Sequence, residues 1–377
     1  MNLTDAYGRT IEYLRISLTD KCNLRCRYCM PAGGIGRLQH SEVLSLEEIC
    51  RVASVLTELG IRRIRLTGGE PLVRRGIQGL MRNLAELPAR PELAMTTNGV
   101  LLADHLEELK ASGLRSINIS LDTRDRERYR ELTGTDGLEA VEQAIDRAYA
   151  MGFPVKLNAV PIRGINEEEL TDLAEYARDR RIDVRFIELM PMGCAKAYQG
   201  IPEAEILQKL EDRFGPAEQE TADAFVAKQS SLDGTPEEIA EHPRTPGRDP
   251  AKGRLSDSGS AESRLSDADT SEPRLSDRGP AKYVRFRGFA GRVGFISPMS
   301  HAFCSECNRL RLTVDGRLKL CLYYPEGLDV RELLRSGCTD EELKKAIRGI
   351  IRLKPERHSF CETRGAKDRR SMYEIGG

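Results

Sequence analysis

Residues 21–30 read Lys-Cys-Asn-Leu-Arg-Cys-Arg-Tyr-Cys-Met and directly follow a short apolar run typical of a strand. Cys22, Cys26 and Cys29 therefore have the spacing C-x3-C-x2-C. Three thiolates on one loop can bind three irons of a 4Fe–4S cluster, because cluster irons take Cys ligands. The fourth iron then has no protein ligand and can bind a small molecule through an amine and a carboxylate. The alternative is a structural zinc site, but such sites are normally closed by four ligands, and only His40 lies near this loop.

Short apolar runs alternate with amphipathic stretches through the first half of the chain. Ser45 and Glu48 form a capping box, and Gly60 follows the apolar face, which together predict a helix between them. Repeats of strand and helix indicate right-handed crossovers and a parallel sheet. We therefore expect an α/β fold, a partial TIM-type (β/α)6 barrel with its chemistry at the C-terminal ends of the strands. The six expected strands span residues 13–18, 63–66, 93–97, 116–121, 155–160 and 184–189.

The charge balance excludes several classes of function. The 377 residues include 58 basic and 59 acidic side chains, so no global field would attract nucleic acid or a membrane surface. Residues 1–13 lack the apolar region of a signal peptide, and no apolar run is long enough to cross a bilayer. These features predict a soluble cytoplasmic protein. In such a protein, ten cysteines favour metal or redox chemistry over disulfides.

A second set of cysteines lies near the C-terminus. Cys304 and Cys307 form C-x2-C, and Cys321 follows after a strand-like run and a turn at Asp315-Gly316. Three cysteines again suit a cluster with one open iron, which can bind a nitrogen or oxygen atom of a substrate. The alternative is a closed zinc ribbon in which Cys338 supplies the fourth ligand.

Residues 217–281 interrupt the pattern. They are rich in Ser, Asp, Glu, Pro, Arg and Gly, and Arg-Leu-Ser-Asp recurs in them, beginning at Arg254, Arg264 and Arg274. The low apolar content predicts a disordered insert. The repeat is either a docking motif used three times or an expansion by replication slippage in a tolerant loop. The expected domains are a core of residues 1–216, the insert at 217–281 and a C-terminal segment at 282–377, which begins with a hairpin and closes the barrel.

These motifs resemble the GTP 3′,8-cyclase family (molybdenum cofactor biosynthesis protein A) of the radical S-adenosylmethionine superfamily. The resemblance covers nearly the whole chain apart from the insert, which departs from the family pattern. Besides Cys22, Cys26, Cys29 and Cys321, it is carried by Leu14-Arg-Ile-Ser17, Ile64-Arg-Leu-Thr-Gly-Gly-Glu-Pro71, Thr96-Thr-Asn-Gly99, Asn118-Ile-Ser-Leu-Asp122, Arg185-Phe-Ile-Glu-Leu-Met-Pro191, Gly294-Phe-Ile-Ser-Pro298, Cys304-Ser-Glu-Cys-Asn-Arg-Leu-Arg311 and Gly376-Gly377.

The resemblance implies a lyase that performs the first step of molybdenum cofactor biosynthesis. Its implied cofactors are two 4Fe–4S clusters and S-adenosylmethionine. In the family, reductive cleavage of S-adenosylmethionine at the N-terminal cluster gives a 5′-deoxyadenosyl radical that removes the ribose 3′ hydrogen of GTP. C3′ then bonds to C8, giving (8S)-3′,8-cyclo-7,8-dihydroguanosine 5′-triphosphate, while the C-terminal cluster anchors the purine. The implied partners are GTP, the downstream cyclic pyranopterin monophosphate synthase, a flavodoxin- or ferredoxin-type electron donor and, in a homodimer, a second copy.

The resemblance also assigns site residues. The implied catalytic residues are Cys22, Cys26, Cys29, Arg15, Arg309 and Arg311. The implied S-adenosylmethionine contacts are Tyr28, Gly69, Ser120 and Met190. The implied GTP contacts are Arg15, Arg65, Thr96, Lys156, Arg309, Leu310 and Arg311. The implied cluster ligands are Cys22, Cys26 and Cys29 for the first cluster and Cys304, Cys307 and Cys321 for the second.

The chemistry of the cationic residues agrees with a triphosphate ligand. Arg15, Arg65 and Lys156 lie in expected strands, where a charge should be paired or point into the barrel, because a lone buried charge is costly. Arginine forks suit phosphate oxygens, although each residue could instead form a structural salt bridge. Arg309 and Arg311 are two apart on a strand and so share one face. No P-loop is present, so the chain is not an ordinary GTPase.

Other implied contacts also have plain structural alternatives. Gly68 and Gly69 would let the backbone approach the methionine end of the cofactor, but a glycine pair can also form an ordinary turn. Ser120 could instead cap a strand, and Met190 could be core packing. The tail at residues 364–377 enters the active site in the family, or is a frayed end. Its basic residues are Arg369 and Arg370.

Two other functions fit parts of the sequence. One is a different radical S-adenosylmethionine enzyme with an auxiliary cluster, such as a peptide-modifying one, which would not bind GTP. The other is a non-catalytic iron–sulfur or zinc protein, which would not cleave S-adenosylmethionine. Arg309, Arg311 and the C-terminal Gly-Gly argue against the first, and the motif from Thr67 to Pro71 argues against the second.

Deletion of the insert at residues 217–281 is expected to leave catalytic activity intact, because lengthening a surface loop costs little free energy. Turnover of the deletion variant can be compared with that of the full chain under the same anaerobic conditions. A large loss of turnover in a variant that circular dichroism shows to be folded would contradict this expectation.

Overall fold

The structure, a computed structural model, describes residues 2–31, 38–220, 279–360, 368 and 370–376. By compactness the chain divides into two units, Met1–Gln219 with Pro280–Gly377, and Glu220–Gly279. The insert predicted at residues 217–281 and its three repeats therefore lie almost wholly outside the described residues. Cys361, Arg369 and Gly377 lie outside them as well.

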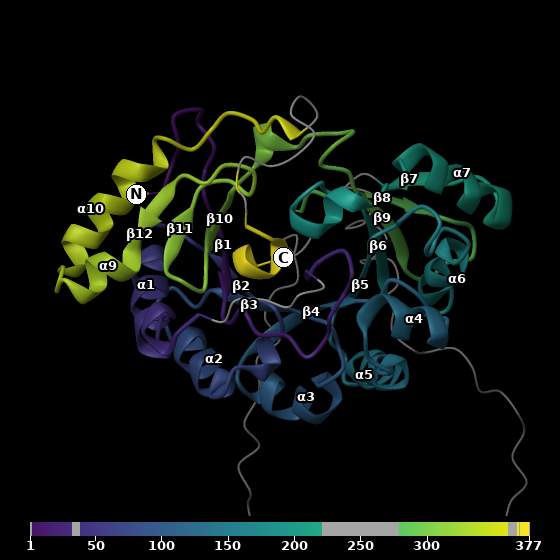
Figure 1. The fold of residues 1–377 in the computed structure, drawn as a ribbon, viewed down its shortest axis with the longest axis horizontal. Helices are drawn as coiled ribbons and strands as arrows, with labels where there is room; N and C mark the ends of the chain where they lie inside the picture. Colours follow the sequence, from purple (N-terminus) through teal and green to yellow (C-terminus); the bar gives the residue numbers. More distant parts are fainter. Residues whose placement is uncertain (1, 32–37, 221–278, 361–367, 369, 377) are drawn as a thin grey trace, which may run out of the picture. The chain divides into compact units, whose positions relative to one another are not determined.

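One sheet organises the first unit. Its strands run in the order β12-β11-β10-β1-β2-β3-β4-β5-β6-β9-β8-β7 (Figure 1). Strands β1 to β6 pair in parallel, with β10 parallel to β1 on one side and β9 parallel to β6 on the other. The strand bounds are β1 (Tyr13–Ser17), β2 (Arg63–Thr67), β3 (Glu92–Thr97), β4 (Leu114–Ser120), β5 (Val155–Ala159), β6 (Asp183–Ile187), β7 (Glu218–Glu220), β8 (Lys282–Arg285), β9 (Arg292–Ile296), β10 (Arg309–Leu312), β11 (Arg317–Lys319) and β12 (Gly327–Asp329).

This topology confirms the predicted α/β fold with a partial barrel. All six expected strands form. The strand order has two separate ends, so the barrel is not closed, contrary to the expectation that the C-terminal segment would close it. The predicted hairpin forms as β8 and β9, which pair antiparallel. The segment after the insert supplies strands to both edges of the parallel sheet. Its second antiparallel unit, β10 to β12, continues outward from the β1 edge.

Helices connect the parallel strands and lie along their outer side, while the short C-terminal helix lies on the other side of the sheet (Figure 1). The capping box at Ser45 starts α1 as predicted, since Ser45 Oγ accepts from Glu48 N at 3.1 Å. The helix bounds are α1 (Leu46–Glu58), α2 (Ile77–Ala85), α3 (Leu102–Ala111), α4 (Arg126–Thr133), α5 (Leu138–Ala150), α6 (Leu170–Ala174), α7 (Glu203–Phe214), α9 (Val330–Arg335), α10 (Asp340–Ile351) and α12 (Met372–Ile375). Short 3-10 turns are η1 (His40–Glu42), η2 (Pro71–Val73), η3 (Glu175–Ala177), η4 (Gly193–Ala197) and η6 (Cys304–Glu306).

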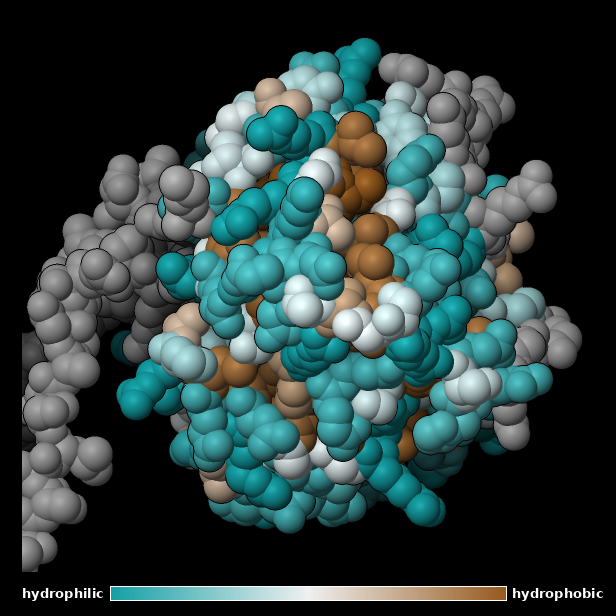
Figure 2. Space-filling model, turned by 90° about the vertical axis from the view of Figure 1, so that its left-hand side faces the viewer, coloured by the Kyte–Doolittle hydropathy of each residue, from teal (hydrophilic) through white to brown (hydrophobic). Residues whose placement is uncertain are grey.

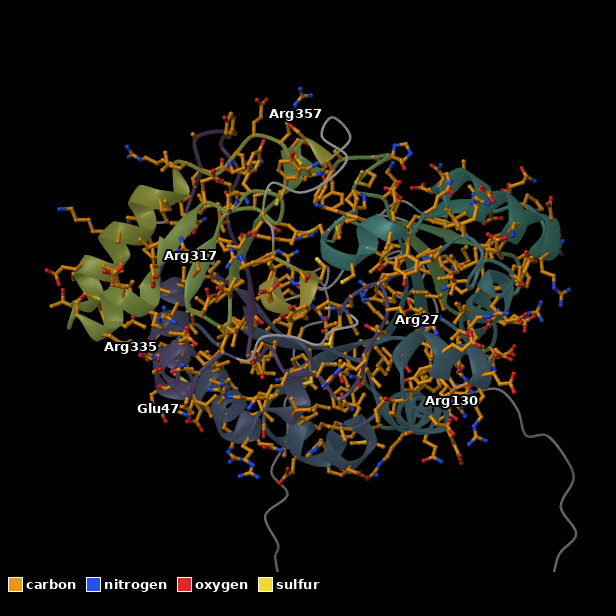
Figure 3. All side chains as sticks on the ribbon, in the orientation of Figure 1. Arg27, Glu47, Arg130, Arg317, Arg335 and Arg357 are labelled. Carbon is orange, nitrogen blue, oxygen red and sulfur yellow. The ribbon has the colours of Figure 1, made fainter. Side chains whose placement is uncertain are left out.

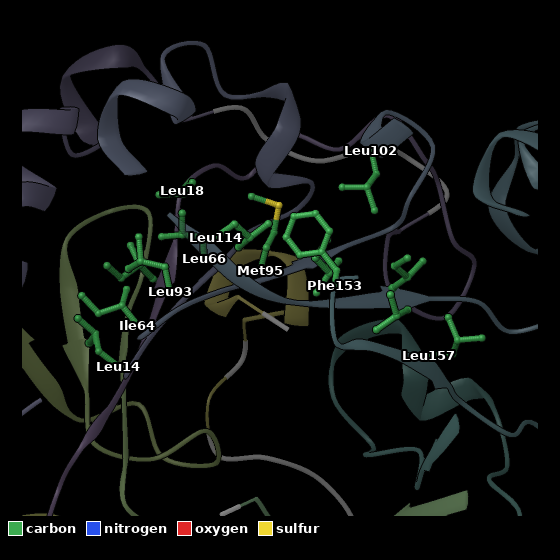
Figure 4. Close-up of a cluster of buried hydrophobic side chains, with 14 of the residues drawn as sticks. Leu14, Leu18, Ile64, Leu66, Leu93, Met95, Leu102, Leu114, Phe153 and Leu157 are labelled. Carbon is green, nitrogen blue, oxygen red and sulfur yellow. The ribbon is translucent and has the colours of Figure 1, made fainter. Parts of the chain in front are cut away.

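The two faces of the parallel sheet differ in chemistry, because side chains alternate along each strand. One face carries Leu14, Ile64, Met95 and Leu157, which belong to the main hydrophobic core (Figure 4). The other face carries polar and charged side chains. We call the polar face the set formed by Arg15, Arg65, Thr96, Asn118, Lys156, Arg309 and Arg311.

The outer surface of the first unit is mostly hydrophilic. Figure 2 shows a face with mainly polar residues and smaller hydrophobic areas between them. In the described ranges, no helix is both long and apolar enough to span a membrane. The nine cysteines within those ranges are free thiols.

Candidate active site

The N-terminal cysteine loop follows β1, as expected for chemistry at the C-terminal ends of the strands. Burial raises the pKa of Cys29 to about 12, with a further contribution from Cys22. Burial also raises the pKa of Cys26 well above its ordinary value, aided by Asp122 and by the two other thiols. The three thiols therefore influence one another and favour the neutral form when no metal is bound. A bound metal reverses that preference, because a coordinating thiol is deprotonated.

The arrangement does not resemble a single-ion site. Within the described ranges, no group of three or more His, Cys, Asp or Glu side chains is arranged to hold one metal ion. A 4Fe–4S cluster makes a different demand, because each thiolate binds its own iron. His40, the one candidate for a fourth zinc ligand, lies in η1 and is exposed.

The Gly68-Gly69 pair fixes the start of the cysteine loop. A Cβ atom on Gly69 would lie 2.4 Å from the carbonyl oxygen of Lys21, and one on Gly68 would lie 2.7 Å from that of Thr19. Gly69 N also donates to Thr19 O at 2.7 Å. The missing side chains thus make room for the chain's own backbone. This close approach of backbone is the structural alternative considered for the glycine pair, and the approach to a cofactor stays a prediction.

Glu70 completes this connection between strands. It is fully buried, and its carboxylate accepts from Thr97 Oγ1 at 2.8 Å and from Asn98 N at 2.7 Å. Asn98 Nδ2 in turn lies 3.6 Å from Cys22 Sγ. The ends of β2 and β3 are therefore joined to the loop that carries the first cysteine.

Substitution Gly69→Ala is expected to lower the free energy of unfolding by about 1–3 kcal/mol, the usual cost of overpacking. It should also lower the iron content of the N-terminal site, because the loop must move away from the new methyl group. Gly79→Ala in α2 is the matched control, since nothing lies within 4 Å of its added Cβ. Wild-type iron content and melting temperature in Gly69→Ala would contradict this account.

The residues assigned to S-adenosylmethionine surround the same strand ends. Tyr28 donates its hydroxyl to Asp122 Oδ2 at 2.7 Å, and Val160 N donates to Asp122 Oδ1 at 2.8 Å. Ser120 is the last residue of β4 and is half-buried. Met190 follows β6 and packs against a small hydrophobic cluster that includes Ile375 of the tail. Packing therefore accounts for part of the role of Met190.

Three arginines of the polar face lie side by side. Arg15 on β1 is in register with Arg65 on β2 and with Arg311 on β10. Burial lowers the pKa of Arg15 well below its ordinary value, and the charge of Arg311 lowers it further. Burial likewise lowers the pKa of Arg311 to about 10, and Arg309 adds to the effect. The arrangement therefore concentrates mutually repelling cations in a buried place, where an anionic ligand would relieve their repulsion.

Surface arginines are differently disposed. Arg27, Arg130 and Arg357 are exposed, and the labels of Arg130 and Arg357 lie toward the edge of the molecule in Figure 3. Of the three arginines in register, Arg65 and Arg311 are instead 6% and 8% exposed, and Arg15 is half-buried.

Some members of the polar face already have structural partners. Arg65 Nε donates to Tyr13 OH at 2.5 Å, and Arg65 Nη1 donates to Met95 O at 2.9 Å. Lys156 Nζ lies 3.8 Å from Asp183 Oδ2, which also accepts from Arg292 Nη2 at 2.7 Å. Lys156 therefore has the structural salt bridge that was considered as an alternative, and Arg65 has structural hydrogen bonds.

Other polar atoms of this face have no such partner. Thr96, Asn118 and Lys156 are in register on β3, β4 and β5. Thr96 Oγ1, Asn118 Oδ1 and Arg309 Nε are buried and have no hydrogen-bond partner within the described ranges. Buried polar groups normally have partners, so these atoms indicate a binding site for a polar ligand.

Leu310 differs from its two neighbours in the position of its side chain. Its side chain is fully buried in the main hydrophobic core, on the face of β10 opposite Arg309 and Arg311. The alternation of side chains along the strand leaves only the backbone of Leu310 on the polar side. A contact between Leu310 and GTP would therefore be made by the Leu310 backbone.

The second set of cysteines lies near the N-terminal end of β10, since Cys304 and Cys307 directly precede this strand. Burial raises the pKa of Cys304, with contributions from Cys321 and Cys307. Burial also acts on Cys307, but Lys354 and Arg309 outweigh it and lower its pKa.

Cys338, the proposed fourth zinc ligand, packs elsewhere. It contacts the main core, whereas Cys321 contacts the smaller cluster around Tyr323. The zinc alternative for the second site thus loses its fourth ligand.

The C-terminal tail lies against the strand ends that carry the site. Arg311 Nη1 donates to the carbonyl oxygen of Gly376 at 2.6 Å. A Cβ atom on Gly376, whose φ is +88°, would lie 2.6 Å from Thr67 Oγ1 and 3.0 Å from Ser17 Cβ. A frayed end is therefore excluded for residues 370–376.

Comparisons with known proteins agree with this geometry. Residues 16–177 match the family model for the radical SAM superfamily, and residues 252–360 match that for molybdenum cofactor synthesis C. The chain is 39% identical to the GTP 3′,8-cyclase of Clostridium perfringens (strain 13 / Type A), with 100% of both chains covered. It is 41% identical to the GTP 3′,8-cyclase of Moorella thermoacetica (strain ATCC 39073 / JCM 9320), again with 100% of both chains covered. The chain belongs to the GTP 3′,8-cyclase family.

A solved structure supports the fold of this family member. The structure of Streptococcus suis SuiB bound to S-adenosylmethionine matches with a TM-score of 0.54 at 14% identity, covering 98% of this chain and 77% of that chain. Members of the family use 4Fe–4S clusters and S-adenosylmethionine, as the spacing of the cysteines and the resemblance together predicted.

Several residues of the site were not found by sequence reasoning. Cys194 lies near enough to Cys29 to affect its pKa, although its position in the sequence shows no cluster spacing. Asp122 holds Tyr28, and Asn118 adds an unpartnered oxygen to the polar face. Lys354 touches Cys307 from a position 47 residues away. Asn118 and Asp122 lie within a quoted family motif, which was the only available signal.

Proposed function

We infer that this chain catalyses the reaction for which its family is named, the cyclisation of GTP between C3′ and C8 in the first step of molybdenum cofactor biosynthesis. The observation that best supports this is the row of in-register arginines on the polar face, between two sets of three cysteines. Such a site can hold a triphosphate with its nucleoside between two clusters.

Cys22, Cys26 and Cys29 would hold the first cluster, and Cys304, Cys307 and Cys321 the second. When bound, the first cluster and S-adenosylmethionine supply the 5′-deoxyadenosyl radical that removes the 3′ hydrogen of GTP. This chain's own part is positioning and exclusion of water.

We propose that Tyr28, Gly69, Ser120 and Met190 surround S-adenosylmethionine. Asp122 fixes the Tyr28 ring through the tyrosine hydroxyl, so the ring cannot swing into the space beside the cysteines. The backbone contacts of Gly69 with Thr19 and Lys21 hold the loop at the strand ends.

We propose that the GTP triphosphate lies against Arg15, Arg65, Arg309, Arg311 and Lys156. Three unpartnered polar atoms support a ligand here, namely Thr96 Oγ1, Asn118 Oδ1 and Arg309 Nε. Arginine suits this role because its planar fork binds two oxygens and stays charged at neutral pH. The tail would exclude water from the same space, since Gly376 lies against Ser17, Thr67 and Arg311.

The finer partners follow from the same reaction. The product would pass to cyclic pyranopterin monophosphate synthase, and an electron donor of flavodoxin or ferredoxin type would reduce the first cluster. We propose that the protein works in the cytoplasm, where free thiols persist, and that it can form a homodimer. Domain bounds of 1–216, 217–281 and 282–377 remain our proposal for its organisation.

Anaerobic turnover tests the proposed function. The protein is reconstituted with iron and sulfide, reduced, and given S-adenosylmethionine with or without GTP. We expect GTP to stimulate formation of 5′-deoxyadenosine and to be consumed. A variant with Cys22→Ala, Cys26→Ala and Cys29→Ala is the control and should form none. If 5′-deoxyadenosine forms and GTP has no effect, the substrate assignment is wrong. If none forms in the wild type, the non-catalytic alternative gains support.

A further inference from the structure

Lys354 is a buried cation beside the second set of cysteines, and the sequence did not predict a role for it. It follows α10 and is 2% exposed. Its Nζ donates to Leu320 O at 2.5 Å and to Arg309 O at 2.9 Å, and lies 3.6 Å from Cys307 Sγ. An ammonium group has three donors, so all three are directed at these acceptors.

The three acceptors come from the segments that carry the second set of cysteines. Cys307 is itself a ligand of the proposed second cluster, Arg309 begins β10, and Leu320 directly precedes Cys321. One ammonium group therefore joins two of the three ligand segments to the strand that carries the GTP-site arginines. Displacing Lys354 would therefore remove the contacts to Cys307, Arg309 and Leu320 at the same time.

A second buried cation reinforces the same region from the N-terminus. Arg9 Nη1 donates to Cys304 O at 2.7 Å and to Glu356 O at 2.9 Å, and Arg9 Nη2 donates to Pro355 O at 2.6 Å. Arg9 also has an anionic partner, because its Nε donates to Asp5 Oδ2 at 2.5 Å. The segment around Lys354 is thus held against the remaining ligand, Cys304.

Lys354 differs from Arg9 in having no carboxylate partner among the described residues. Within the described ranges, no ion pair of Lys354 with a carboxylate is found, and its bonds to Leu320 and Arg309 are to neutral carbonyl groups. A buried ammonium without a nearby anion is costly. The thiolate of Cys307 in a bound cluster would supply the missing negative charge.

We propose that Lys354 is a positioning residue of the C-terminal cluster, which holds Cys307 as a ligand and stabilises the reduced state of that cluster. The inference rests on the proposed second cluster. Hydrogen bonds to the sulfurs and nearby net charge set the reduction potential of iron–sulfur clusters. A positive charge beside Cys307 favours the added electron, so its removal should lower the potential.

The test isolates the second cluster in the full-length chain. The parent variant carries Cys22→Ala, Cys26→Ala and Cys29→Ala, so any cluster must be held by Cys304, Cys307 and Cys321. Lys354→Met is introduced into this parent, with Lys354→Arg as the conservative variant. Lys344→Met on α10 is the matched control, because Lys344 forms surface ion pairs with Glu58 and Glu341. Iron and sulfide content is measured first, followed by an anaerobic redox titration monitored by electron paramagnetic resonance.

We expect Lys354→Met to shift the reduction equilibrium toward the oxidised cluster by about tenfold, which is about 59 mV for one electron. Lys354→Arg should restore most of this shift, and Lys344→Met should show none. Loss of iron in folded Lys354→Met, recovered in Lys354→Arg, would also support the proposal. If Lys354→Met does not fold, Lys354→Gln, which keeps a donor but removes the charge, should show the same direction of shift.

Two outcomes would overturn the inference and can be told apart. A parent variant that is folded but binds no iron would overturn the second cluster and this inference together. A parent that binds iron, with an unchanged potential in iron-replete Lys354→Met or Lys354→Gln, would overturn the role of Lys354 alone.

Discussion

Replacing Arg311 with methionine is expected to lower kcat/KM for GTP about 100-fold. Arg311 is 8% exposed and is in register with Arg15 on the polar face. Its Nη1 also donates to Gly376 O at 2.6 Å, so one side chain serves both the proposed triphosphate site and the tail. Hydrogen bonds to charged groups contribute about 1.5–3 kcal/mol each. Loss of about 2.7 kcal/mol corresponds to about 100-fold, because each 1.4 kcal/mol is tenfold.

The kinetic pattern separates this role from a general loss of stability. We expect the KM for GTP to rise, while S-adenosylmethionine binding stays close to that of the wild type. Arg317→Met on the neighbouring strand β11 is the matched control, since Arg317 is 40% exposed and lies 4.0 Å from Asp329. An unchanged KM for GTP in folded Arg311→Met would contradict the proposed triphosphate site.

Replacing Asp368 with alanine is expected to lower the free energy of unfolding by about 3–5 kcal/mol, the usual cost of breaking a buried ion pair. The Asp368 carboxylate accepts hydrogen bonds from Lys319 Nζ and from Arg370 Nη2. The Lys319 side chain is fully buried, so the substitution leaves a buried charge without its anion. Asp368 also binds Arg370, which directly precedes the tail segment that lies against the proposed site. Activity should therefore fall as well.

Two comparisons make this test specific. Asp136→Ala removes a carboxylate from the exposed pair with Arg126, and exposed pairs contribute little to stability because solvent screens them. The double variant Asp368→Leu with Lys319→Met should recover most of the stability, because apolar residues of similar volume often replace a buried pair at little cost. Asp368→Ala with the melting temperature of Asp136→Ala would contradict the account.

The pH dependence of this effect has a definite sign. Burial acts to raise the pKa of Asp368, but hydrogen bonds from Arg370 and Lys319 outweigh it and lower the pKa. A pKa that is lower in the folded state than in the unfolded state stabilises the protein at pH values above the unfolded pKa of about 3.9. That stabilisation is lost as the pH falls through the folded value. The difference in stability between wild type and Asp368→Ala should therefore be full at neutral pH and shrink below about pH 4.

Local signals explain which parts of the fold were predictable. The six central strands were predicted from short apolar runs that alternate with amphipathic stretches, and the helix after Ser45 from its capping box. Both signals depend on residues that are neighbours in the sequence. The placement of β10 beside β1 and of β9 beside β6 depends on contacts between distant segments. No local pattern in the C-terminal segment indicates that its strands would extend both edges of the sheet.

The candidate site shows the same division. Spacing and family motifs predicted both sets of cysteines and the arginines of the polar face as site residues. They could not identify Lys354 or Cys194, because these residues reach the cysteines only after folding. They also predicted Leu310 as a GTP contact without distinguishing its side chain, which lies in the core, from its backbone.

The most direct test of the central claim uses GTP that carries deuterium at C3′. The reconstituted protein is reduced and incubated anaerobically with this substrate and S-adenosylmethionine, and the 5′-deoxyadenosine is analysed by mass spectrometry. The account predicts that one deuterium appears in 5′-deoxyadenosine and that the nucleotide product has lost it. Formation of 5′-deoxyadenosine without deuterium, with the GTP recovered unchanged, would contradict it.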